Sequence, residues 1–304
     1  MFREPFMQRA LIEVCLLAVI AGLVGTFVLI RRHAFVADAL THTMFPGIAI
    51  SFFAGGSLFI GALGAAVLST VLLTVLGSLR RVDDDSVLAL LVATFFATGV
   101  VVVSRRPSFA SDLNSLLFGH LLTVDQSTIV QTAVITTVVA ATLVLTAKEL
   151  VLRAFDPEAF RAFGYRLVVV DALTNAAVAL VIVAAARAIG TALVVALLVT
   201  PAATARLMSD RIRTIAAIAI VLVAGCGAVG LAISYTASVD HDLRIEPAAA
   251  ITVLLTVAFA LAAAGRFFLR HRRLATTTTG TGHGAGQSHG HGAGPDSAGE
   301  RVLS

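Results

Sequence analysis

An aspartate and a histidine stand four residues apart in an otherwise apolar stretch of this chain. They are Asp38 and His42. On an α-helix, residues i and i+4 lie on one face, so a carboxylate oxygen and an imidazole nitrogen could reach one small cation. This pair of ligand atoms suits Mn²⁺, Fe²⁺ or Zn²⁺ and does not discriminate among them. The spacing therefore predicts a site for a divalent transition metal.

The same two residues also fit a plain structural role. An ionisable side chain at bilayer depth costs at least about 2.5–3.5 kcal/mol, so Asp38 needs a partner that offsets this cost. A divalent cation is one such partner. A buried hydrogen bond to His42, or a position near the membrane face just after residues 31–33, also fits the spacing. Pro46 removes a backbone donor and Gly47 loosens the helix, so we expect a bend just past the pair.

The elements that carry this pair are predicted to be membrane-spanning helices. Of the 304 residues, 58% are hydrophobic and 13% are charged, and the mean hydropathy is +0.95. A water-soluble domain could not cover so much apolar surface. We predict an all-α, polytopic membrane protein with about nine transmembrane helices, eight being the alternative count. The apolar segments cover roughly residues 11–30, 34–53, 58–79, 86–103, 128–147, 168–186, 188–207, 212–236 and 247–269.

The basic residues predict how the chain lies in the membrane. They stand at the ends of apolar segments rather than in one patch, so topology explains the net charge of +4 better than binding to nucleic acid does. If every segment crosses, nearly all of them fall on one side, which the positive-inside rule assigns to the cytoplasm. We therefore expect a multi-pass protein of the cell (inner) membrane, with the N-terminus outside and the C-terminus in the cytoplasm. Residues 105 and 106 are the exception, and residues 104–127 predict a short interfacial helix.

A short cytoplasmic helix is predicted between two of the spans, in residues 152–166. An aspartate, a proline and a glutamate begin it and a glycine ends it, which is the order that caps a helix. Its three phenylalanines could insert into a groove on a soluble partner, although an ordinary capped helix at the interface has the same pattern. The residues concerned are Phe155, Asp156, Pro157, Glu158, Phe160, Arg161, Phe163 and Gly164.

Two further polar groups lie near the ends of apolar segments. Asp240, His241 and Asp242 fall in an external loop, where they could concentrate cations at the outer mouth or simply be solvated. Asp171 and Asn175 stand four residues apart near the cytoplasmic end of a span. They could line a central path, or they could form a hydrogen-bonded pair in helix packing.

The C-terminal end of the chain has a different composition. From residue 274 onward it is rich in Thr, Gly and His and cannot bury enough apolar area to order itself, so we predict a disordered cytoplasmic tail. His283, His289 and His291 could bind a transition metal weakly there, or remain solvated. We thus divide the chain into a transmembrane domain, residues 1–273, and a His/Gly-rich tail, residues 274–304.

Four stretches of the chain occur in an order typical of one family. They are residues 35–49, 112–119, 155–164 and 190–207, the first containing the aspartate, the histidine and the Pro-Gly pair described above. Together they resemble the membrane subunits of the ABC-3 class of metal-ion importers, which serve manganese, zinc or iron uptake in bacteria. The resemblance extends over roughly residues 11–268, nearly all of the chain except the tail.

This resemblance implies a type II ABC-importer-like permease and a role for each of these stretches. Asp38 and His42 would hold the ion in the outward pathway. The family usually has serine just before that histidine, and Thr41 keeps a hydroxyl here, so it is a third candidate ligand. The helix at residues 156–164 would be the coupling helix docked on a cytoplasmic ATP-binding subunit. Outside, a solute-binding protein or lipoprotein would deliver the ion, and the permease would pair with itself or a close relative.

We therefore predict the permease subunit of an ATP-driven importer of a divalent transition metal. No phosphate-binding loop of the form Gly-x-x-x-x-Gly-Lys-[Ser/Thr] is present, so the chain is not expected to be an enzyme, and ATP hydrolysis is expected on a separate subunit. No permanently bound cofactor is expected. Manganese is favoured over zinc, and zinc over iron, because the candidate site lacks thiolate and a second histidine. A proton-coupled secondary carrier is the alternative, and a membrane scaffold or receptor is a third class.

Overall fold

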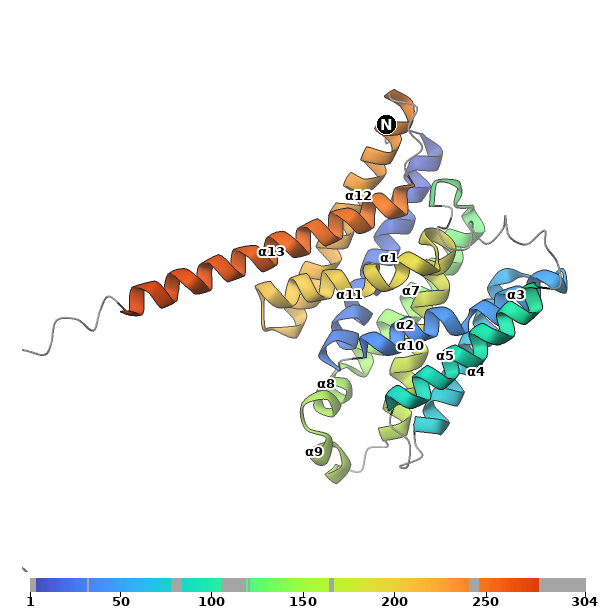
Figure 1. Cartoon of the computed structure of the whole chain (residues 1–304), viewed down its shortest axis with the longest axis horizontal. Helices are drawn as coiled ribbons and strands as arrows, with labels where there is room; N and C mark the ends of the chain where they lie inside the picture. Colours follow the sequence, from blue (N-terminus) through green and yellow to red (C-terminus); the bar gives the residue numbers. More distant parts are fainter. Residues whose placement is uncertain are drawn as a thin grey trace, which may run out of the picture. The chain divides into compact units, whose positions relative to one another are not determined.

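The computed structural model describes residues 4–31, 33–77, 84–104, 119, 121–163, 167–240 and 246–278. Within these ranges all regular structure is helical, as predicted (Figure 1). The helices are α1 (Pro5–Ile30), α2 (Ala34–Thr43), α3 (Phe45–Phe53), α4 (Leu58–Gly77), α5 (Asp84–Val103), the 3-10 helix η2 (Leu121–Thr123), α7 (Gln126–Leu145), α8 (Ala147–Phe155), α9 (Pro157–Ala162), α10 (Leu167–Ile189), α11 (Thr191–Met208), α12 (Ile212–Asp240) and α13 (Pro247–Thr278). Most of the interfacial helix expected in residues 104–127 lies outside the described residues.

Eight helical segments in the described part of the chain are long and apolar enough to cross a membrane. This is the smaller of the two predicted counts. The difference lies in α11, whose apolar part, Leu193–Met208, is shorter than the other spans. It begins directly after Gly190, whose φ of 80° lies in the left-handed region that side chains other than glycine rarely adopt. A single glycine therefore ends α10 and lets α11 start at once.

The second span is interrupted where a bend was predicted. It consists of α2 and α3, which are separated by Met44, and Pro46 lies in the first turn of α3. Because proline has no N–H, it cannot donate to the carbonyl of His42 four residues earlier. That carbonyl instead accepts the N–H of Met44. The prediction of an interruption just past the Asp-His pair is confirmed, and its cause is local.

The core of the bundle is built around α1. This helix packs against α12, α7, α11 and α10, while α3 packs on α4, and both α2 and α3 pack on α5 (Figure 1). Glycines permit the closest crossings: a Cβ on Gly25 would meet the backbone carbonyl of Leu198, and one on Gly47 would meet that of Gly61. Small residues of this kind are what allows transmembrane helices to approach backbone to backbone.

One carboxylate is buried inside this core. Glu13 of α1 is fully buried, and its Oε1 accepts a hydrogen bond of 2.7 Å from the Thr132 hydroxyl of α7. Its Oε2 has no partner among the described residues. A polar contact at bilayer depth joins two helices because neither group can hydrogen-bond to lipid. Glu13 therefore holds α1 to α7 by a polar bond within an apolar interface.

The end of the chain extends the last helix. The chain divides into two compact units, Met1–Ala263 and Ala264–Ser304. The helix α13 continues through Thr278, five residues into the predicted tail. No helix-breaking residue occurs there before Gly280. The rest of the tail, with His283, His289 and His291, lies outside the described residues.

Candidate metal site and its supporting network

The Asp38 and His42 side chains lie on one face of α2, as the spacing predicted. Asp38 Oδ1 is 3.9 Å from His42 Nε2, and the two side chains are 56% and 51% exposed, respectively. A distance of 3.9 Å is too long for a hydrogen bond. The alternative of a buried, hydrogen-bonded pair therefore does not hold. The arrangement leaves ligand atoms of both side chains accessible from the same side of the helix.

Thr41, the third candidate ligand, does not share this exposed face. It is 5% exposed, and its hydroxyl donates a 2.6 Å hydrogen bond to the backbone carbonyl of Asp38. On a helix its side chain lies on a different face from that of His42, the next residue. The structure thus brings together two of the three predicted ligands within one chain.

Aromatic side chains of α5 and α3 lie on one side of the histidine. The ring of His42 meets Phe96 of α5 edge-on, with centroids 6.4 Å apart. Phe96 in turn stacks on Phe45 at 5.8 Å. Phe45 has room for this because it lies against Gly99 of α5, where a Cβ would meet its ring. The imidazole is therefore held beside an apolar wall, which limits the rotamers it can adopt.

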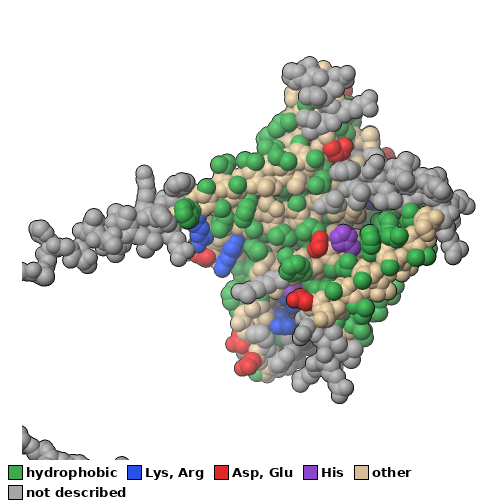
Figure 2. Space-filling model, viewed as in Figure 1, with side chains coloured by type: hydrophobic (Ala, Val, Ile, Leu, Met, Phe, Trp, Pro, Cys, Tyr) green, Lys and Arg blue, Asp and Glu red, His purple; other side chains and the backbone are tan. Residues whose placement is uncertain are grey.

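The surface around the pair is apolar. Phe35 and Phe96 are 74% and 48% exposed, and Figure 2 shows hydrophobic side chains spread over the helices in view, with few charged ones. An ionisable pair that faced lipid across such a surface would carry the full cost of leaving water. This face of α2 therefore requires a cover other than lipid, either protein or a water-filled path.

Among the residues that the structure describes, the pair is incomplete as a metal site. No group of three or more His, Cys, Asp or Glu side chains converges anywhere in the residues that the structure describes. Two monodentate ligands leave most coordination positions of a divalent transition metal unfilled. The described residues therefore do not complete a metal site, and water or another protein subunit is a source of the remaining ligands.

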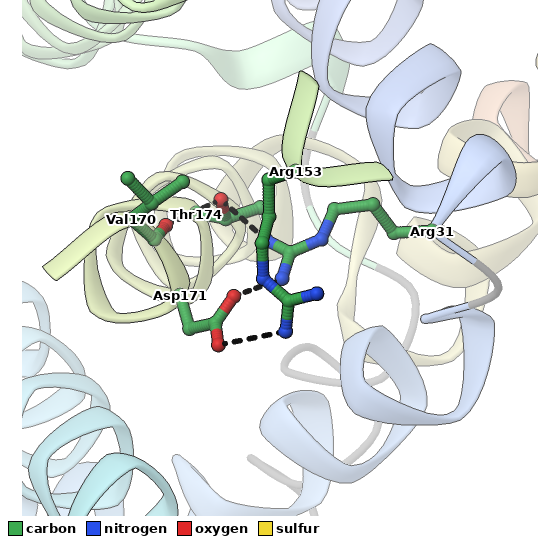
Figure 3. A network of polar contacts seen from close by, with 5 residues as sticks. All are labelled: Arg31, Arg153, Val170, Asp171 and Thr174. Atoms are coloured by element: carbon green, nitrogen blue, oxygen red, sulfur yellow. Dashed lines mark hydrogen bonds and ion pairs between the residues drawn. The ribbon is translucent and has the colours of Figure 1, made fainter. Parts of the chain in front are cut away.

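A second polar cluster joins the ends of three helices (Figure 3). Arg31, which follows α1, forms an ion pair with Asp171 of α10 and donates a 2.8 Å hydrogen bond to the Thr174 hydroxyl. Arg153 of α8 lies 3.3 Å from the other carboxylate oxygen of Asp171. The Thr174 hydroxyl is itself bonded to the carbonyl of Val170. One carboxylate therefore connects α1, α8 and α10.

This network corrects a prediction made from the sequence. Asp171 pairs with two arginines from other helices rather than with Asn175, whose buried Oδ1 has no partner in the described part of the chain. The partners are 140 and 18 residues away in the sequence. One feature that Asp171 and its two arginine partners share could be read from the sequence. All three charged residues stand at helix ends that the sequence assigns to one side of the membrane. The sequence placed the three residues on one side of the membrane but did not predict that they pair.

The predicted coupling segment forms two short helices, α8 and α9, joined at Asp156. The Asp156 carboxylate accepts a hydrogen bond of 3.1 Å from the backbone N–H of Glu158, so the predicted cap is confirmed. Phe155 and Phe163 are 69% and 72% exposed. Phe160 is fully buried in the hydrophobic core, so the expectation that all three phenylalanines project is wrong.

The boundaries of α9 explain this difference. The helix covers Pro157–Ala162 only, so Phe155 precedes it and Phe163 follows it. Phe160 lies within the helix, and its side chain is buried against the rest of the bundle. Phe160 therefore anchors the segment, and the two outer phenylalanines remain available to a partner. Several predicted site residues cannot be placed, because they or their side chains lie outside the described part of the chain: Pro157, Arg161, Gly164, Asp240, His241 and Asp242.

The comparison with known proteins identifies the family. The family model described as "ABC 3 transport family" matches residues 3–266. The chain belongs to this family. The resemblance found in the sequence is confirmed, and the protein is an ABC-3 permease, a transport subunit that is not itself catalytic.

Individual relatives agree with this assignment. The chain is 32% identical over 265 residues to the manganese import system permease protein ScaB of Streptococcus gordonii, covering 87% of this chain and 94% of the relative. It is 30% identical over 262 residues to the manganese transport system membrane protein MntC of Listeria monocytogenes, covering 86% and 91%. A probable iron transport system membrane protein of Haemophilus influenzae is 30% identical over 234 residues, covering 77% and 83%.

The fold of the ABC-3 permease is shared with a solved structure. "PsaBC from Streptococcus pneumoniae in complex with Fab" superposes with a TM-score of 0.74 at 27% identity, covering 86% of this chain and 91% of that one. An inward-facing structure of a putative metal-chelate type ABC transporter has a TM-score of 0.64 at 16% identity, covering 84% and 85%, and is similar in fold alone. The predicted all-helical importer fold is thereby confirmed.

Proposed function

We propose that this permease conducts Mn²⁺ into the cell as part of an ATP-driven importer, with Asp38 and His42 lining the path. The observation that carries the proposal is the half-exposed Asp-His pair on an otherwise apolar face of α2. Charged or ionisable side chains at membrane depth face a bundle interior or a water-filled path. Relatives named as manganese import permeases share most of the chain's length, which supports transport of the same ion.

A second copy of this chain, or a close relative, would complete the metal site. In a two-fold interface the same surface patch is used on both sides, so the exposed face of α2 would meet its counterpart. Two subunits would then offer two carboxylates and two imidazoles to one ion. The same contact would remove all four side chains from lipid. We therefore place the ion path at the interface between two permease subunits.

Manganese is the metal that this ligand set favours. Carboxylate oxygens together with imidazole nitrogens, without thiolate, suit Mn²⁺ or Fe²⁺, while structural zinc sites usually include more sulfur or imidazole ligands. The names of the relatives include manganese and, for one, iron. Zinc and iron remain the next candidates in our proposal.

Three further features of the proposal concern partners and orientation. ATP hydrolysis takes place on a separate cytoplasmic subunit, against which the exposed Phe155 and Phe163 dock. Arg153 in the last turn of α8 contacts Asp171, so the network of Figure 3 links the docking segment to α1 and α10. A solute-binding protein or lipoprotein delivers the ion from outside.

The N-terminus lies on the outer side of the membrane and the C-terminal tail lies in the cytoplasm.

Uptake of radiolabelled manganese and zinc by cells tests the proposal. The wild type is compared with Asp38→Ala and His42→Ala at equal abundance in the membrane, and with Asp210→Ala as a control that removes a carboxylate 85% exposed at the surface. Both site variants are expected to lower manganese uptake to the background of cells without the chain. The control variant is expected to keep wild-type uptake.

The outcomes separate the alternative functions. Unchanged uptake in both site variants would remove Asp38 and His42 from the path. Uptake that persists after deletion of the ATP-binding subunit would favour a proton-coupled carrier. Loss of zinc uptake with manganese uptake intact would overturn the choice of metal while keeping the site.

A further inference from the structure

An apolar groove runs along the outside of the bundle between α1, α7, α8 and α12. Its volume is about 850 Å³, within the range of about 300–1,000 Å³ of pockets that hold a small-molecule ligand. Its walls include Leu23 and Phe27 of α1, Leu143 and Val144 of α7, and Ile220 of α12. No acidic side chain is among the described residues that line it. In a membrane protein, an apolar groove that opens outward is filled by lipid unless protein covers it.

Two cations stand at one end of this groove. Lys148 in the first turn of α8 and Arg213 in the first turn of α12 both line it, and both are exposed. Neither forms an ion pair within the described part of the chain, in contrast to Arg31 and Arg153, which share Asp171. The end of the bundle where they lie is the one that the positive-inside rule assigns to the cytoplasm.

The groove has the length and polarity of a lipid site. From Arg213 to Ile220 the wall formed by α12 extends about 10 Å along the helix, at 1.5 Å per residue. It is therefore charged at its outer end and apolar over the next two turns toward the membrane interior. Basic pockets between transmembrane helices on the cytoplasmic side are characteristic sites for anionic lipid headgroups. The two free cations favour a headgroup with net negative charge over a zwitterionic one.

We propose that this groove binds an anionic phospholipid, with its phosphate and headgroup on Lys148 and Arg213 and an acyl chain along the apolar wall. The lipid supplies the negative charge that the described side chains lining the groove do not provide. It also covers apolar side chains of α1 and α12 that would otherwise enclose empty space. The site is separate from the Asp38 and His42 face and does not depend on the transported metal.

Tryptophan fluorescence offers a direct test, because the chain contains no tryptophan. The variant Val144→Trp places a single reporter on the groove wall, where the native side chain is 67% exposed. Full-length protein is reconstituted in phosphatidylcholine with increasing fractions of brominated phosphatidylglycerol or brominated phosphatidylcholine as quencher. The control reporter is Leu145→Trp, because Leu145 is 79% exposed on the same helix but does not line the groove.

Preference for the anionic lipid is expected at the groove reporter only. Brominated phosphatidylglycerol should quench Val144→Trp at a lower mole fraction than brominated phosphatidylcholine, and Lys148→Ala or Arg213→Ala should each reduce that preference about fivefold. Arg211→Ala, which removes an exposed cation outside the groove, should leave it unchanged. Added inorganic phosphate should not restore the fluorescence, since a free anion lacks the acyl chain.

Three results would overturn the proposal. Equal quenching by the two lipids would show that the cations do not select a headgroup. The absence of quenching by either lipid would show that a protein segment fills the groove. An equal loss of preference in Arg211→Ala would show a general effect of surface charge. A second reporter, Val151→Trp, lies on the part of the groove lined by α8. If the first tryptophan alters the groove locally, the second provides an independent measurement, and it should give the same ranking of lipids.

Discussion

Replacing Asp171 by asparagine tests how much the network in Figure 3 stabilises the permease. In the described part of the chain, Asp171 is the carboxylate within ion-pair distance of both Arg31 and Arg153. Asparagine keeps nearly the same shape and one oxygen that can accept a hydrogen bond, but it removes the negative charge. The two arginines would then face each other without a counter-ion.

The burial of the three side chains sets the magnitude. Arg31 is 4% exposed, Arg153 is 24% exposed and Asp171 is 29% exposed. Removal of one partner from a fully buried pair costs about 3–5 kcal/mol, and an exposed pair contributes about 0–1 kcal/mol. Arg31 keeps its 2.8 Å hydrogen bond to Thr174, and water reaches part of Asp171. We therefore expect the free energy of unfolding to fall by about 2–3 kcal/mol.

The measurement is the fraction of protein that remains folded in detergent after heating, followed by size-exclusion chromatography. Asp210→Asn is the matched control, because it breaks the Arg206–Asp210 pair, whose side chains are 48% and 85% exposed at 3.6 Å. The double variant Arg31→Gln with Asp171→Asn should recover part of the loss, since it leaves one arginine fewer without a counter-charge. Equal small losses in Asp171→Asn and Asp210→Asn, or fully additive losses in the double variant, would refute the reasoning.

Three other pairs of substitutions give distinct expectations for stability by the same assay. Gly47→Ala should destabilise by about 1–3 kcal/mol, because its Cβ meets a backbone carbonyl of α4, whereas Gly64→Ala, with open space around it, should change little. Glu13→Ala should lower stability more than Glu13→Gln, which can keep the 2.7 Å bond between α1 and α7; equal losses would contradict a role for that bond. Phe160→Ala should cost about 3–5 kcal/mol and Phe163→Ala about 0.5 kcal/mol or less, and the reverse order would mean that α9 is not anchored by its buried ring.

Features governed by local rules were predictable from the sequence. Hydropathy located the spans because the membrane imposes nearly the same length on every segment that crosses it. The spacing of Asp38 and His42 placed their side chains on one face because helical geometry is regular. The interruption at Met44 followed from Pro46, which acts only on its own helix. Each of these inferences needed no knowledge of which helices pack together.

Features that depend on packing were not predictable in the same way. Phe160 is as apolar as Phe155 and Phe163, and only its burial against the bundle distinguishes it. Asp171 found partners from α1 and α8, and a nearby polar residue on its own helix was the wrong candidate. Thr41 turned its hydroxyl to the helix backbone, which competes with any ligand role. In each case the face that a side chain presents is decided by neighbours distant in the sequence.

The length of α11 bears on the electrical barrier to a dication. Its apolar part, Leu193–Met208, extends about 24 Å at 1.5 Å per residue, against a hydrocarbon core about 30 Å thick. The helix packs against α1, α2, α10 and α12, so neighbouring protein rather than lipid surrounds much of it. A short helix at membrane depth is tolerated where protein or water covers its ends. If Asp38 lines the ion path as we propose, the low-dielectric layer beside α2 would be thinner than along the longer spans, and the ion would have less of it to cross.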